Sequence, residues 1–212
     1  MISGYIVKKG EMTSIFSDKG KKISVTKCTA LPLTVTQVKT DEKDKYSAIQ
    51  VAVGEKKRLP QAVEKKLKKL KLKIKPLHFK EFKLTTDTLP AIGDQITFDS
   101  VFQVNDTVSV SGTTKGRGFA GVIKRHGFHR QPVTGGQSDR TRAPGSIGAQ
   151  TPGKVLKGKK MPGHFGNTTH TVSNLKIISF NPENNEVMIS GSVPGHTNSW
   201  IIISKSKHYD KS

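Results

Sequence analysis

Two glycine-rich stretches in the middle of the chain have the spacing of nucleotide-binding motifs. Residues 116–121 read GRGFAG and match G-x-G-x-x-G, in which the glycines allow a pyrophosphate to approach the backbone. Residues 148–154 read GAQTPGK and match G-x-x-x-x-G-K, the pattern of loops that surround the phosphates of a nucleoside triphosphate. The chemistry that these spacings would support is the binding of a dinucleotide or of ATP.

The surroundings of both motifs argue against that chemistry. A dinucleotide fold needs a helix directly after the glycines and a strand-end acid about 20 residues further on. Gly127 and Pro132 interrupt the segment after the first motif, and Asp139 stands in a polar stretch. In the second motif Val155 replaces the Ser or Thr that magnesium chemistry requires, and Pro152 lies inside the loop. A nucleotide-dependent enzyme stays open only as a rival hypothesis, which equilibrium dialysis against NAD and ATP would decide.

The remaining chemistry-bearing side chains do not form a catalytic or metal-binding set. His126 and His129 are three residues apart, with His164 and His170 further on, but no second cysteine or carboxylate pair completes a tetrahedral site. Cys28, the only cysteine, rules out an internal disulfide, fits a reducing compartment and is predicted to be a core residue. We therefore expect no catalytic residue, no metal, no cofactor and no small-molecule substrate.

The charge of the chain is its most informative property. Its 212 residues carry 36 Lys and Arg against 16 Asp and Glu, which gives a net charge of +20 and an isoelectric point near 10.1. A compact chain with this excess repels itself unless it meets a polyanion. Nucleic acid, an anionic membrane surface and an acidic protein are the candidate partners. No apolar run approaches the roughly 20 residues of a membrane span, and the N-terminal residues do not resemble a signal peptide, so we expect a cytoplasmic protein.

The elements that must position these residues are mostly strands. Short β-rich segments separated by turn signals fill residues 2–53, and strand patterns return at residues 77–111 and after residue 167. Strands at this spacing predict a small barrel or sandwich. Residues 61–75 differ, because apolar side chains recur there at helical spacing among seven lysines, with Pro60 and Pro76 at the ends. This basic amphipathic helix could lie on a membrane or on a partner, but the prediction that we favour is a helix docked on its own sheet.

Residues 112–166 interrupt the strand pattern. They contain 13 of the 20 glycines and eleven Lys or Arg against one acid, Asp139, so about a quarter of the chain carries half of its net charge. So long a segment without periodicity is usually functional or disordered. Glycines allow close approach to a sugar-phosphate backbone, and the cations can neutralise phosphates. The alternative is that the segment is simply disordered. We favour a segment that RNA orders, and for residues 145–167 in particular we expect order from phosphate rather than from a protein core.

If about half of these cations contact phosphate, affinity for RNA should fall by roughly two to three decades between 50 and 200 mM salt. Phe119 is a further candidate for stacking on bases. The predicted RNA-binding residues are Lys115, Arg117, Lys124, Arg125, His126, Phe128, His129, Arg130, Arg140, Arg142, Gln150, Lys154, Lys157, Lys159, Lys160 and His164.

Longer stretches of the sequence resemble one family. Residues 111–128, SGTTKGRGFAGVIKRHGF, followed by residues 142–167, RAPGSIGAQTPGKVLKGKKMPGHFGN, are similar to large-subunit ribosomal protein three in its bacterial-length form. Flanking stretches support the resemblance over nearly the whole chain: KKGEMTSIF, LTVTQVKT, YSAIQVAVGEKK, VSNLKII and SGSVPG.

The resemblance implies a mostly β fold with an α+β elaboration, a β-barrel of the kind shared by translation proteins that carries an inserted α/β portion and a long irregular basic extension. The implied organisation is barrel strands in 1–55, 93–111 and 168–212, an inserted basic helix and strand region in 56–92, and an extended RNA-threading loop in 112–167.

The implied function is that of a non-enzymatic, structural constituent of the large ribosomal subunit. Such a protein binds ribosomal RNA directly, acts early in subunit assembly and sends its extension toward the peptidyl-transferase region. Its partners would be large-subunit ribosomal RNA and neighbouring ribosomal proteins, with no membrane. Gln150 falls where some bacterial relatives carry a methylated glutamine. An independent RNA-binding architectural or chaperone-like protein is the alternative.

Some positions depart from the family pattern. Glu11 stands where the family usually has glycine, and His126 where tryptophan is common. Residues 134–142 lack histidines often found there, and residues 145–153 are one residue short. These departures concern the contacts near the tip of the extension and leave its positive charge unchanged.

Overall fold

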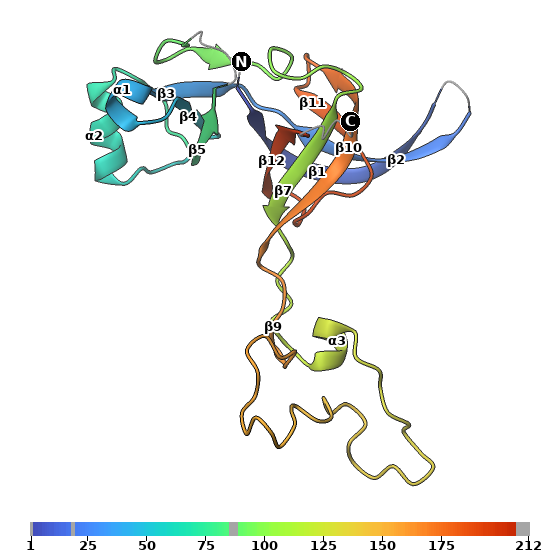
Figure 1. Ribbon diagram of the computed structural model, residues 1–212. Coiled ribbons are helices and arrows are strands. Elements are labelled where there is room, and N and C mark those ends of the chain that lie inside the picture. The colour runs from blue at the N-terminus through green and yellow to red at the C-terminus, as the bar shows by residue number, and fades with distance from the viewer. Residues whose placement is uncertain (1, 18–19, 85–88, 207–212) are drawn as a thin grey trace, which may run out of the picture. The chain divides into compact units, whose positions relative to one another are not determined.

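The computed structural model describes residues 2–17, 20–84 and 89–206 (Figure 1). Residues 18–19 of a predicted turn, residues 85–88 of the predicted inserted region and residues 207–212 of the predicted last segment lie outside the described residues. The chain divides into two compact units. Unit 1 is formed by residues 1–113 and 169–212, and unit 2 by residues 114–168.

Unit 1 contains a closed antiparallel barrel with the strand order β1-β12-β7-β10-β11-β2 (Figure 1). In β7 and β12 alternate side chains are buried, among them Val108, Val110, Ile201 and Ile203, and the residues between them are partly exposed. This period of two places one row of each strand inside the barrel. The predicted β-barrel fold class is thus confirmed. The barrel strands are β1 (Gly4–Phe16), β2 (Lys22–Thr29), β7 (Thr107–Thr113), β10 (Thr169–Asn181), β11 (Glu186–Ser190) and β12 (Trp200–Lys205).

A second antiparallel sheet in unit 1 has the order β5-β4-β3-β6. Its strands are β3 (Leu33–Lys39), β4 (Ala48–Val53), β5 (His78–Lys83) and β6 (Gln95–Ile96), and the short helix α1 (Asp41–Asp44) joins β3 to β4. The predicted organisation assigned residues 1–55 and 93–111 to barrel strands, but β3, β4 and β6, which lie within these ranges, belong to the second sheet. The reason is that alternation reveals a strand but not the sheet in which it pairs.

Tyr5 joins the two sheets of unit 1. Its hydroxyl donates to the carbonyl oxygens of Leu31 and Ile96, at 2.9 and 3.1 Å, and its ring meets Phe98 edge to face at 5.2 Å. Burial, followed by the charge of Asp99, raises the pKa of Tyr5 above its ordinary value, so the hydroxyl keeps its proton. Barrel and second sheet share one continuous hydrophobic core.

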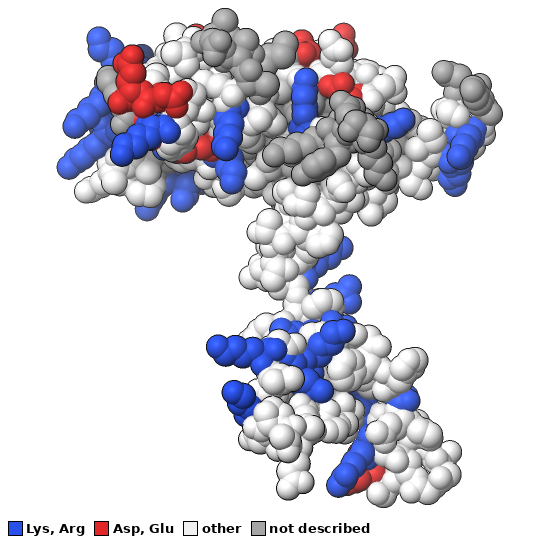
Figure 2. Space-filling model, in the orientation of Figure 1, with Lys and Arg blue, Asp and Glu red and all other residues white. Residues whose placement is uncertain are grey.

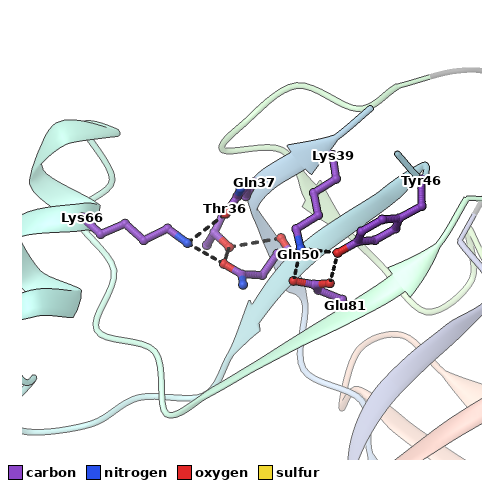
Figure 3. A network of polar contacts seen from close by, with 7 residues as sticks. All are labelled: Thr36, Gln37, Lys39, Tyr46, Gln50, Lys66 and Glu81. Atoms are coloured by element: carbon purple, nitrogen blue, oxygen red, sulfur yellow. Dashed lines mark hydrogen bonds and ion pairs between the residues drawn. The ribbon is translucent and has the colours of Figure 1, made fainter. Parts of the chain in front are cut away.

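Helix α2 (Gln61–Lys69) lies on the second sheet. Its Leu67 is buried, and Lys66 Nζ donates to Oε1 of Gln37 and of Gln50, at 3.1 and 2.8 Å (Figure 3). The prediction of a helix docked on its own sheet is confirmed.

The helix ends earlier than the predicted residue 75. Lys71 adopts a left-handed backbone conformation, with a φ of +57°. Its N–H donates to Lys68 O, and the Leu72 N–H donates to Leu67 O. This is the Schellman arrangement that terminates helices. Periodicity alone did not reveal this stop, because the apolar spacing continues through Ile74.

A second polar cluster lies on the same sheet (Figure 3). Lys39 Nζ pairs with Glu81 Oε1 at 2.9 Å and donates to the Tyr46 hydroxyl, which in turn donates to Glu81 Oε2 at 3.1 Å. These hydrogen bonds raise the pKa of Lys39 and lower that of Glu81. The cluster ties β3 and β5 together across the intervening strand β4.

Candidate nucleic-acid interface

The two ends of unit 2 pair through their backbones and form a neck, which we define as residues 114–120 and 163–168. The Thr114 N–H donates to Thr168 O at 2.9 Å, and the Arg117 N–H donates to Phe165 O at 2.8 Å. Beyond these bonds, β8 (Phe119–Ala120) pairs antiparallel with β9 (Gly163–His164). The neck therefore has a defined hydrogen-bonding pattern of its own.

Gly166 is required by the close approach of the two neck segments. Its φ is +76°, and a Cβ at this position would lie 2.0 Å from Lys115 O. Only glycine fits both the left-handed backbone and the contact.

A short helix, α3 (Val122–His126), continues from the neck. Arg125 Nη1 donates to Met161 O at 2.7 Å, and His126 Nε2 lies 3.0 Å from the same oxygen. Gly163 leaves room for the guanidinium, because a Cβ there would lie 2.7 Å from Arg125 Nη1. Two predicted RNA-binding residues thus also hold the protein chain together.

Residues 129–160 form the rest of unit 2 and contain no helix or strand. Each of them is exposed or half-buried, and none is buried. Among the described residues of unit 2 the buried apolar side chains are Ala120, in the neck, and Val122, just after it. This stretch consequently has no hydrophobic core of its own.

The predicted phosphate-binding cations lie almost entirely at the surface. Among the described residues the ion pairs are Lys39–Glu81 and Lys68–Glu64, both in unit 1, so no carboxylate pairs with a cation of unit 2. Figure 2 shows Lys and Arg spread over this unit with very little acidic surface between them. The charge is therefore available to an outside polyanion.

The structure places the sixteen predicted site residues in two groups. Arg125, His126 and Phe128 are half-buried around α3, with the rings of His126 and Phe128 6.1 Å apart. The others are exposed: Lys115, Arg117, Lys124, His129, Arg130, Arg140, Arg142, Gln150, Lys154, Lys157, Lys159, Lys160 and His164.

Aromatic contacts at the neck involve residues that the predicted set omitted or ranked low. Phe119 is 70% exposed and meets the His164 ring edge to face at 6.0 Å. The guanidinium of Arg117 lies 5.6 Å from the centre of the Phe165 ring. Phe165 and the Met161 carbonyl were not predicted to take part. Gly163 and Gly166, on either side of Phe165, could have indicated close packing of the backbone there. Nothing in the sequence indicated that Met161 O accepts hydrogen bonds from side chains.

The two nucleotide-like motifs do not have the structural context that their chemistry needs. The glycines of residues 116–121 flank a two-residue strand in an antiparallel pair and precede a five-residue helix that ends at Gly127. Residues 148–154 lie in the stretch without helix or strand. The groups of His, Cys, Asp and Glu in the described part of the chain include none that could hold a metal ion.

Cys28 lies on the core side of β2 and is buried. Burial raises its pKa to about 12, which keeps the thiol protonated and unreactive. The prediction of a core residue is confirmed. None of the helices within residues 2–17, 20–84 and 89–206 has the length and apolarity to cross a membrane.

Fold and charge together define a β-barrel protein with a cationic, largely coreless inserted unit. The family model described as Ribosomal protein L3 matches residues 17–186. The chain belongs to the ribosomal protein L3 family, as the resemblance predicted, and it is a structural constituent of the ribosome rather than an enzyme.

Curated relatives agree along nearly the whole length. Each is named large ribosomal subunit protein uL3. The chain is 44% identical over 209 residues to that of Herpetosiphon aurantiacus, with 97% of both chains covered. It is 43% identical over 206 residues to that of Brachyspira pilosicoli, covering 96% of this chain and 93% of the relative. The relative from Syntrophobacter fumaroxidans is 42% identical over 210 residues, at 97% and 98% coverage.

Proposed function

We propose that this chain binds large-subunit ribosomal RNA directly, takes part in early assembly of that subunit, and sends unit 2 into RNA toward the peptidyl-transferase region. The names of the relatives support the choice of subunit. In this proposal the RNA-threading loop comprises residues 112–167, and neighbouring large-subunit proteins are further partners.

The observation that carries the proposal is the combination of charge and missing core in residues 129–160. A chain segment that buries few apolar groups cannot offset the entropy lost on ordering. Phosphates that neutralise the exposed cations, with release of counterions, supply the missing free energy.

The exposed and half-buried members of the predicted set have different parts in this proposal. The exposed lysines and arginines contact phosphates, and Phe119 and His164 offer ring surfaces to bases. Arg125 and His126 anchor α3 to Met161 and thereby fix where the loop leaves the neck.

Hydrogen exchange of the full chain tests the proposal. Without RNA, we expect amides in 129–160 to exchange rapidly, while β7 and β12 stay protected. The neck belongs with the protected group, because the Phe165 and Asn167 amides donate to backbone oxygens of residues 114–118. In this proposal RNA orders residues 145–160, while residues 163–167 are held by the backbone bonds of the neck.

Adding a large-subunit ribosomal RNA transcript should protect residues 129–160. Strong protection of these amides before RNA is added would mean that the protein alone orders the loop, and the proposal would fail.

An independent architectural or chaperone-like RNA-binding protein would have the same charge. It would bind many RNAs alike, whereas a ribosomal constituent should resist competition from unrelated structured RNA at fixed salt. Loss of ribosomal RNA to such a competitor would favour the alternative.

Gln150 is the proposed modification site. Its side chain is exposed and is followed by a turn in which Gly153 has a φ of +71°, so a modifying enzyme can reach it. We expect the peptide containing Gln150, isolated from native ribosomes, to carry the mass of one additional methyl group. An unmodified peptide from the same source would remove this assignment.

A further inference from the structure

Unit 1 has a second concentration of positive charge. Residues 56–75 contain ten Lys or Arg and one acid, Glu64, a net charge of +9 in 20 residues. This segment lies in unit 1, whereas the loop of the proposed function lies in unit 2. Its charge therefore needs an explanation of its own.

The local structure places part of this charge on two neighbouring segments, which we call straps: residues 56–57 before α2 and residues 72–75 after it. After α2 ends at Lys69, the chain turns at Lys71 and returns in an irregular path through residues 72–75. The Lys56 N–H donates to Lys75 O at 2.8 Å, which joins the strap before the helix to the strap after it. Lysines of both straps are thus held side by side although 16 to 19 residues separate them in the sequence.

The straps line a groove of about 850 Å³. Its lining includes the apolar side chains of Ala52, Val53 and Ile74. Four exposed lysines also line the groove, namely Lys56, Lys57, Lys73 and Lys75, with Glu55 as the acid among the lining residues.

None of the four groove lysines forms an ion pair among the described residues, where the ion pairs are Lys39–Glu81 and Lys68–Glu64. Their positive field also acts on a neighbour. Burial, and then the charge of Lys56, lowers the pKa of His78. Four ammonium groups held around one groove repel one another until an anion binds.

We propose that this groove of Lys56, Lys57, Lys73 and Lys75 binds the phosphate backbone of RNA and is a second RNA contact, separate from unit 2. The identity of the partner as RNA rests on the proposed function.

Two other polyanions fit less well. A helix that binds a membrane surface needs an apolar face to insert, but α2 directs Leu67 into the protein. Protein interfaces gain most of their affinity from Trp, Tyr and Arg anchors, whereas the positively charged residues that line the groove are lysines. Compact ammonium charges on flexible stems suit phosphates.

Filter binding of the full chain to a large-subunit ribosomal RNA transcript, between about 50 and 200 mM salt, tests this inference. We expect Lys56→Gln, Lys57→Gln, Lys73→Gln and Lys75→Gln together to lower the slope of log affinity against log salt by roughly 3. Across that range the wild type should then lose roughly 50- to 100-fold more affinity than the variant. A matched variant carries the same change at four exposed lysines of unit 1 outside the groove, Lys21, Lys22, Lys45 and Lys83, and should keep a slope close to that of the wild type.

The outcomes separate this inference from the proposed function. If the wild type shows no preference for ribosomal RNA over unrelated RNA, the proposed function fails. If it binds ribosomal RNA with that preference and the groove variant keeps the wild-type slope, the groove inference is wrong. The groove inference would also be overturned if the matched variant lost as much of the salt slope as the groove variant. The same holds if the groove substitutions weakened binding only to polyglutamate or to anionic phospholipid vesicles. Unchanged circular dichroism and melting temperature of the groove variant show that the fold is intact.

Discussion

Gly166→Ala is expected to open the neck of unit 2 while leaving the barrel folded. The added Cβ would lie 2.0 Å from Lys115 O and 2.9 Å from Lys115 C, and both are backbone atoms that a side-chain rotation cannot move away. A left-handed backbone costs a residue with a side chain roughly 1–2 kcal/mol, and overpacking adds roughly 1–3 kcal/mol. The bonds on either side of Gly166, from Arg117 N to Phe165 O and from Asn167 N to Thr114 O, should break.

Hydrogen exchange of the full chain measures this effect. The amides of Arg117, Phe165 and Asn167 should lose protection in the variant, and those of β7 and β12 should keep it. Affinity for ribosomal RNA should fall as well, because the loop would leave the neck without a fixed direction.

Gly118→Ala is the matched control for the same neck. Gly118 has a φ of +64°, but a Cβ there would meet nothing within 4 Å. The Gly118→Ala substitution therefore has the cost of a left-handed backbone without a steric clash, and it should destabilise the neck by about 1–2 kcal/mol. Equal loss of protection in both variants would show that the contact with Lys115 does not hold the neck closed.

The barrel was predictable because its strands bury every second residue. Val108 and Val110 alternate with partly exposed residues, as do Val187 and Ile189, and this period of two is visible in the sequence. The allocation of strands to sheets was not predictable in the same way. Leu33 and Val35 alternate just as clearly, yet they lie in the second sheet, whose pairing depends on contacts far along the chain.

The candidate site was predictable in its charge but not in its architecture. The excess of Lys and Arg over acid in residues 112–166 is a property of composition, and it was visible directly. The anchoring of Arg125 to Met161 O depends on a backbone atom 36 residues away, which no local pattern indicates. The groove beside α2 was hidden for a similar reason, because the turn at Lys71 just after the helix is what brings its two straps together.

Neutralising the lysines of the loop should weaken RNA binding strongly without changing stability. Lys154, Lys157, Lys159 and Lys160 are exposed and lie where no residue is buried. Substituting all four by Gln removes four charges, so the slope of log affinity against log salt should fall by roughly 3. The melting temperature should stay close to that of the wild type, because surface substitutions of this kind usually change stability by less than about 0.5 kcal/mol each.

Replacing the same four lysines by Arg separates charge from side-chain identity. Arg keeps the positive charge, so the salt slope of this variant should equal that of the wild type. If both variants lose affinity equally, specific lysine geometry rather than phosphate neutralisation holds the RNA. If the Gln variant keeps the full slope, the loop cations do not contact phosphate, and the exposed charge of unit 2 must serve another partner.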